Sequence, residues 1–197
     1  SILEKKIGFR PRFTILYAGT FGRVNGLDYV TKLAAKLINL DSGIVFVLLG
    51  DGSEKKEVIQ KAKDIGVLNK NIFILNSVAK KDLSQLYYEC DMGSSFVIPI
   101  KELWANSANK FFDTLAAGKP ILINHNGWQK NLIHKKNIGY VLPTIIDNNA
   151  VKEFELYTKD KALISTQQIN GLNVAKRNYA TDIAVKKYNK IFQYIKK

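Results

Sequence analysis

The sequence predicts a doubly wound α/β domain, in which a Rossmann-like parallel sheet of about six strands is followed by C-terminal helices. Two observations lead to this prediction. Short apolar, β-branched and aromatic runs, bounded by glycine, proline or asparagine, recur along most of the chain. Segments with helical periodicity lie between them, and parallel strands need such crossovers, which are right-handed and place helices on both faces of the sheet.

Six segments fit buried strands: 13–18, 44–49, 71–75, 94–98, 120–124 and 139–142. The helical period is clear from Leu27 to Ile38 and from Leu83 to Tyr87. After Pro143 only helices are expected, over 151–157, 162–174 and 183–195. The last helix carries an apolar stripe that we expect to pack on the parent domain, although a terminal helix can also reach a partner domain; the stripe is Val185, Tyr188, Ile191, Phe192 and Ile195.

Length and composition fit one domain, 1–197, with one core, since 46% of the 197 residues are apolar. The single cysteine, Cys90, excludes an internal disulfide and fits a cytoplasmic location. The apolar runs are far shorter than the roughly 20 residues that span a bilayer. The chain starts at Ser1 without an initiator methionine or a signal peptide, so we expect a piece of a longer protein.

The net charge of +13 favours anionic partners: phosphates, nucleic acid or an anionic membrane surface. Lysine-rich surfaces also simply keep proteins soluble. A nucleic-acid-binding domain would need basic residues interleaved with aromatic ones on one face, whereas these lysines are scattered. We therefore expect no nucleic-acid partner and favour a peripheral contact with anionic lipid.

A glycine loop separates the first strand from the first helix and reads Gly19-Thr20-Phe21-Gly22-Arg23-Val24-Asn25-Gly26. Glycines let the backbone approach an anion, and the free amides of a helix N-terminus favour negative charge. Arg23 adds a forked donor suited to phosphate oxygens. The spacing differs from G-x-G-x-x-G, which disfavours a nicotinamide cofactor. The alternative interpretation is a tight turn without a ligand.

Two more loops are expected at the same edge of the sheet, where ligands of parallel sheets gather. The second strand leads into Gly50-Asp51-Gly52-Ser53, in which Asp51 or Ser53 can cap the next helix. The third strand leads into a turn around Val78, whose backbone is suited to reading a base edge.

The segment after the fourth strand decides the functional prediction. Asn106-Ser107-Ala108-Asn109-Lys110 opens a helix, so its amides face an anion while Lys110 offers a point charge. Asp113 lies one turn from Asn109, where a carboxylate can accept from two vicinal hydroxyls of a ribose. Alternatively, Asp113 only complements the helix dipole.

Together these motifs resemble, in order, those of family 4 glycosyltransferases. The run from Asn106 to Asp113, followed by Leu115-Ala116-Ala117-Gly118-Lys119-Pro120, is similar to the donor-site helix of that family. The similarity is greatest to the subgroup that handles amino-deoxy sugars in surface polysaccharide assembly, whose strand-end turn resembles Asn-His-Asn-Gly-Trp at 124–128. The resemblance covers almost the whole chain from Phe13 onwards.

The resemblance implies a retaining, metal-independent transferase of the GT-B type, of which 1–197 is the C-terminal donor domain and the N-terminal acceptor domain is absent. Its diphosphate contacts fall on Gly22 and Arg23, and its ribose carboxylate falls on Asp113. The first glutamate of its paired motif falls on Ala105, and the loop lysine of many members falls on Asn25. We therefore expect Lys110 to supply the missing positive charge.

Cleavage of the bond between sugar and diphosphate builds negative charge on the leaving phosphate, so Arg23 and Lys110 are the predicted catalytic residues. No cofactor is expected. The donor, by resemblance a UDP-sugar, is expected to contact Gly19, Thr20, Phe21, Gly22, Asn25, Gly50, Asp51, Gly52, Val78, Asn106, Ser107, Ala108, Asn109 and Asp113.

The expected acceptor is a glycan or a polyprenyl-linked glycan, bound through the N-terminal domain at the inner face of the membrane. His125 is a further candidate for sugar contact, and Glu102 is considered as a replacement for the lost acid. A non-catalytic nucleotide-binding Rossmann module is the alternative, and it would have no use for Lys110 and Asp113.

Overall fold

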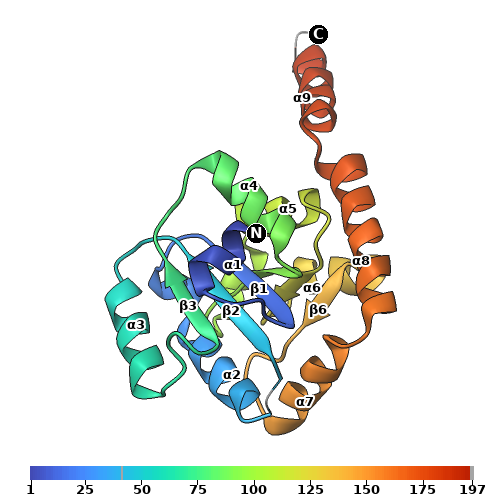
Figure 1. Cartoon of the computed structure of the whole chain (residues 1–197). Helices are drawn as coiled ribbons and strands as arrows, with labels where there is room; N and C mark the ends of the chain where they lie inside the picture. Colours follow the sequence, from blue (N-terminus) through green and yellow to red (C-terminus); the bar gives the residue numbers. More distant parts are fainter. Residues whose placement is uncertain (41, 196–197) are drawn as a thin grey trace.

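The computed structural model describes residues 1–40 and 42–195 and confirms the predicted fold class. One six-stranded sheet has the order β3-β2-β1-β4-β5-β6, with every pairing parallel (Figure 1). The strands are β1 (Phe13–Ala18), β2 (Ile44–Leu49), β3 (Ile72–Leu75), β4 (Met92–Ser95), β5 (Ile121–Ile123) and β6 (Gly139–Val141). The strand order reverses between β1 and β4, so the carboxyl ends of these strands flank the crevice where such sheets bind ligands.

Helices cover both faces of the sheet. One face carries α2 (Asp28–Ile38), α3 (Lys55–Asp64) and α7 (Asn148–Tyr157), which share an apolar cluster with β1 and β2. The other face carries α1 (Ile2–Ile7), α4 (Lys80–Glu89), α5 (Asn109–Ala116) and α6 (Trp128–Lys136). The long helix α8 (Lys161–Val174) lies along α5 at the β6 side of the sheet.

The position of β4 corrects the prediction of a strand over 94–98. Its ladder begins earlier, where Met92 pairs with Ile15, and it ends at Ser95, which pairs with Ile123. Beyond that point the chain leaves the sheet, and the N–H of Val97 donates to the side chain of Asn124 at 3.0 Å. Three of its four residues are small, and at Gly93 the reason is that α5 lies directly on the strand: a Cβ there would come 2.1 Å from the Thr114 hydroxyl. The apolar run at 96–98 therefore belongs to the loop that follows the strand.

Helix α1 was not predicted, since six residues are too few to show a period. Leu3 and Ile7 bury against α4. The carboxylate of Glu89 accepts from the N–H groups of Ile2 and Leu3 at 3.0 and 2.7 Å. Glu89 thus satisfies the amides at the start of α1 from a neighbouring helix.

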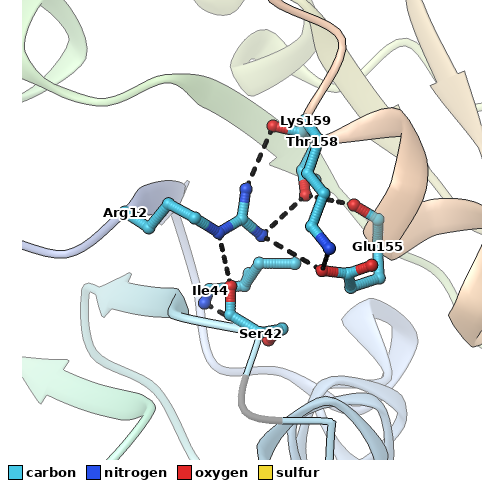
Figure 2. A network of polar contacts seen from close by, with 6 residues as sticks. All are labelled: Arg12, Ser42, Ile44, Glu155, Thr158 and Lys159. Atoms are coloured by element: carbon cyan, nitrogen blue, oxygen red, sulfur yellow. Dashed lines mark hydrogen bonds and ion pairs between the residues drawn. The ribbon is translucent and has the colours of Figure 1, made fainter.

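Arg12 joins three segments at the amino-terminal edge of the sheet (Figure 2). Its guanidinium donates to the carbonyl of Ser42 at 2.5 Å, and to the carbonyl and the hydroxyl of Thr158 at 3.2 and 3.0 Å. Glu155 lies 3.8 Å away and also pairs with Lys159. The network holds the end of α7 against the chain that enters β1 and β2.

The last helix, α9 (Thr181–Ile195), corrects a second prediction. It follows a π-helical turn, η3 (Ala175–Tyr179), and extends away from the body of the domain (Figure 1). Val185, Tyr188, Ile191 and Phe192 are each at least 50% exposed, so the stripe does not pack on this domain. Within the described ranges, no helix is both long and apolar enough to cross a bilayer.

Candidate functional site

The two glycine loops pack directly against each other at the carboxyl edge of the sheet. β1 and β2 end side by side, with Ala18 paired to Leu49. A Cβ at Gly50 would come 1.9 Å from the carbonyl oxygen of Gly19, and one at Gly52 would come 2.5 Å from that of Phe21. The N–H of Phe21 also donates to the carbonyl of Asp51 at 2.8 Å. Only residues without a Cβ permit this approach, so the loops form one unit.

A pocket of about 300 Å³ lies between these loops and the turn after β3. It brings together five of the predicted donor residues: Gly19, Thr20, Gly50, Asp51 and Val78. Thr20 and Asp51 expose their side chains there, and Ser77 adds a hydroxyl. Residues from three separate loops thus line one pocket, and their contact with a donor stays a prediction.

Two predicted donor residues point inward instead. The side chain of Phe21 is fully buried, and its carbonyl accepts from the N–H of Glu54 at 2.9 Å, so both of its backbone groups are bonded within the domain. Asn25 is only 9% exposed. Both residues hold the loop in shape, and their contact with the donor stays a prediction.

The expected caps of α3 are also absent from the described structure. Glu54 occupies the N-cap position and makes no side-chain cap bond. Asp51 accepts instead from the N–H of Gly52 at 2.8 Å, and Ser53 makes no cap bond. Lys55, at the start of α3, donates to the carbonyl of Gly50 at 2.8 Å, so this helix braces the second loop.

Lys110 of α5 reaches across to the first glycine loop. Its ammonium donates to Oδ1 of Asn25 at 3.0 Å and lies 5.1 Å from the centre of the Tyr17 ring. It forms no ion pair with a carboxylate in the described part of the chain. Burial lowers the pKa of Lys110. An uncompensated cation thus lies where β1, the loop and α5 meet.

Helix α5 opens toward the same edge. Ala108 is the N-cap, and the N–H groups of Asn109 and Lys110 have no partner among the described residues. The N–H of Asn106, expected to be free, donates to the carbonyl of Leu103 at 3.1 Å. Ser107 and the side chain of Asn106 remain exposed. The helix start therefore offers two free amides, which belong to the first and second residues after the N-cap.

The carbonyl of Asn106 is held from α6. It accepts from Nε1 of Trp128 at 3.2 Å and from Nε2 of Gln129 at 2.9 Å. Gln129 is buried. These contacts fix the turn that leads into α5, and apart from the Asn-Gly-Trp turn no sequence pattern indicated them.

Asp113 lies one turn further along α5 and is exposed. Burial of part of the carboxyl raises its pKa, and the nearby ammonium of Lys80 opposes that rise. Lys80 is the first residue of α4, directly after the Val78 turn. Asp113 is thus near the pocket turn, with a cation but no fixed hydrogen-bond donor among the described residues.

Arg23 belongs to a short 3-10 turn, η1 (Arg23–Asn25), which begins after Gly22. Its guanidinium is exposed and makes no hydrogen bond or ion pair within the described chain. Asn25, two residues on, bonds Lys110, so Arg23 and α5 share the carboxyl edge.

His125 and Glu102, the two remaining candidates from the sequence, differ in exposure. His125 is 2% exposed and its Nδ1 lies 2.7 Å from the carbonyl oxygen of Asn126. Burial lowers its pKa. His125 is therefore a buried residue, and its contact with a sugar stays a prediction. Glu102 is exposed on the turn η2 (Lys101–Ala105).

Tyr17 is a site residue that the sequence did not reveal. Its hydroxyl donates to the carbonyl of Thr20 at 2.7 Å, and its ring lies beneath the Lys110 ammonium. In the sequence Tyr17 is one of several apolar residues in a buried strand, and nothing local distinguishes it. No cluster of three or more potential metal ligands occurs in the residues that the structure describes.

The parallel six-stranded sheet with helices on both faces is the Rossmann-like architecture of GT-B proteins, and comparisons with known structures agree. HepE of Anabaena, solved with UDP, aligns over 98% of this chain and 52% of its own, with a TM-score of 0.82 and 16% identity. WaaG, a glycosyltransferase involved in lipopolysaccharide biosynthesis, aligns over 94% of this chain and 49% of its own, with a TM-score of 0.72 and 18% identity. These likenesses establish the Rossmann-like GT-B fold.

The family follows from the sequence itself. The profile of glycosyl transferases group 1 matches residues 2–172, and the chain belongs to that family. Spore coat protein SA of Bacillus subtilis is 20% identical over 146 residues, which are 71% of this chain and 37% of that protein. The chain thus spans about half or less of these relatives' length. The amino-deoxy-sugar subgroup stays a prediction.

Proposed function

We propose that this chain is the donor-binding half of a retaining glycosyltransferase and that its donor is a UDP-sugar. The observation that carries the proposal is the half-buried Lys110 ammonium, which meets the glycine loop without a carboxylate partner in the described chain. A buried charge is costly unless an opposite charge compensates it. A diphosphate is such a charge, and free amides at the start of α5 favour it as well.

The neighbouring groups suit the rest of a sugar nucleotide. Asp113 is suited to accept from ribose hydroxyls, and the turn at Val78 is suited to read a base edge through its backbone. The solved complexes of Anabaena HepE with UDP and with UDP-glucose support uridine as the base. An amino-deoxy sugar is the finer prediction from the motif around Asp113.

Catalysis in this proposal consists of stabilising the leaving diphosphate. As the bond to the anomeric carbon breaks, negative charge grows on the phosphate. Arg23 belongs to the turn after Gly22, and Lys110 contacts the first glycine loop from α5, so both cations are suited to stabilise that charge. Removal of one preorganised donor typically costs about 2–4 kcal/mol in the barrier. Arg23→Ala in the full-length enzyme should therefore lower kcat about a hundredfold. Lys63→Ala, an exposed lysine on α3, is the charge control and should leave kcat unchanged.

We propose a glycan or polyprenyl-linked glycan as the acceptor, bound by a second domain at the inner face of the membrane. The length of the aligned structures, about twice that of the matched part, supports a second domain. The net charge of +13 supports contact with an anionic lipid surface.

Calorimetry with uridine, UMP, UDP and UDP-sugars tests the donor assignment. UDP should bind at least tenfold more tightly than UMP, because a second phosphate adds negative charge for the Lys110 ammonium and the free amides at the start of α5. UDP-glucose and UDP-N-acetylglucosamine then compare the sugars. Equal affinity for UMP and UDP, or a preference for uridine alone, would support a non-catalytic nucleotide module instead.

A further inference from the structure

We propose that Asn25 is a positioning residue, which holds the Lys110 ammonium against the glycine loop so that the loop and α5 present one cation to an anionic donor. The role of that cation in donor binding rests on the function proposed above. The positioning itself rests on contacts within this domain.

Asn25 uses both ends of its side-chain amide. Its Oδ1 accepts from Nζ of Lys110 at 3.0 Å, and its Nδ2 donates to the carbonyl of Thr20 at 2.9 Å. The same carbonyl accepts from the hydroxyl of Tyr17 at 2.7 Å. Asn25 is 9% exposed, so water does not easily replace these bonds. The Asn25 amide therefore connects the loop backbone to α5, and Tyr17 connects the same carbonyl to the sheet.

The neutrality of this acceptor matters. A carboxylate at the position of Asn25 would orient the ammonium equally well but would cancel its charge. A hydrophobic residue would leave the charge of the Lys110 ammonium unchanged but would not hold the ammonium in place. The amide orients Lys110 and leaves its full charge for a ligand. Asn25 is therefore chemically suited to positioning a cation rather than to neutralising it.

The walls around Lys110 restrict its side chain as well. The Tyr17 ring lies on one side, with its centre 5.1 Å from Nζ. On another side, a Cβ at Gly19 would come 2.8 Å from Cε of Lys110, so a larger residue there would push the end of the lysine side chain aside. β1 and the loop thus contact the Lys110 side chain on two sides, and Asn25 adds the hydrogen bond that orients its ammonium.

The first test compares Asn25→Asp with Asn131→Asp, an exposed position on α6 that receives the same change in charge. Asn25→Asp should weaken UDP binding about tenfold to a hundredfold, since a hydrogen bond to a charged group is at stake. Asn131→Asp should change it by less than about twofold. An equal effect of both variants would reduce Asn25 to a contributor of net charge and overturn the proposal.

The second test exchanges the two residues. Lys110→Asn removes the cation and should weaken UDP binding about tenfold or more, and Asn25→Lys alone crowds two ammonium groups together. The double variant Asn25→Lys with Lys110→Asn places the cation at the other end of the same bond. It should recover at least about tenfold of the affinity that Lys110→Asn loses, a coupling that independent sites do not show. Additive losses in the double variant would contradict the positioning role.

A third measurement needs no donor. The NMR signal of the Lys110 side chain reports its environment in the ligand-free chain, with thermal unfolding to check that each variant is folded. Asn25→Asp should raise the pKa of Lys110, and Asn25→Leu should lower it and increase its mobility. An unmoved Lys110 signal in both variants refutes the positioning role. If the signal moves but wild-type chain does not bind UDP, the donor assignment fails while the positioning stands.

Discussion

Gly50→Ala should separate the two glycine loops and thereby weaken donor binding. The new Cβ would come 1.9 Å from the carbonyl oxygen of Gly19, whereas an ordinary contact is 3.4 Å or more, so the loops must part by about 1.5 Å. Neither partner can rotate away, since one is backbone and the other is Cβ. The backbone at Gly50 has a φ of 146°, which adds conformational strain.

The cost divides into two parts. Overpacking and backbone strain together should lower the free energy of unfolding by about 3 kcal/mol. For a domain of this size, that corresponds to a fall in Tm of about 6–12 °C. Displacement of the pocket wall by more than 1 Å should weaken UDP binding at least about tenfold.

Gly66→Ala is the control that separates the loss of stability from the loss of donor binding. Gly66 also has a positive φ, 80°, but its Cβ would meet nothing closer than Nζ of Lys70 at 3.8 Å. That variant should lose about 1 kcal/mol of stability and keep its affinity for UDP. Calorimetry and thermal unfolding measure both quantities. If Gly50→Ala binds UDP as tightly as Gly66→Ala does, the packed loops do not form the donor pocket.

Three further predictions concern stability. Arg12→Ala should lower the free energy of unfolding by about 2–3 kcal/mol, measured by denaturant unfolding, because three hydrogen bonds are lost. The control is Arg10→Ala, which should cost less than about 0.5 kcal/mol because the Arg10 side chain is 87% exposed. Equal losses would contradict the network in Figure 2. Burial alone would raise the pKa of Glu89, but its hydrogen bonds lower it from 4.5 to about 2, so its stabilisation is full above about pH 5 and is lost as the pH falls toward 2. Glu89→Gln should therefore lower Tm at pH 7 by a few degrees and converge with wild type near pH 2; a constant difference would show that the charge is not involved. Phe192→Ser should leave the Tm of this chain within about 2 °C, because the side chain is 60% exposed, and a larger fall would show that α9 packs on the domain.

The local features of this protein were readable from its sequence. The limits of β1 and β2 agree with the prediction at both ends, because each is a long apolar run between turn residues. The glycine loops were found because a missing Cβ is visible in the sequence itself. The shared edge followed from the rule that parallel strands end together. β4 was misplaced because three of its four residues are small, and Gly93 is small because a helix more than twenty positions later packs directly on it.

Pairing through space was decided by the tertiary structure. Asn25 and Lys110 are 85 positions apart, and nothing near either residue in the sequence indicates that one accepts from the other. The position of Tyr17 beneath the Lys110 ammonium was equally hidden. The exposure of the stripe on α9 was hidden too, because periodicity shows that a helix is amphipathic but not what its apolar side faces. Periodicity and glycine placement are properties of neighbouring residues in the chain. The partner of a buried polar atom depends on how whole elements pack, so the fold class and the motifs came from the sequence, and the position of the cation came from the fold.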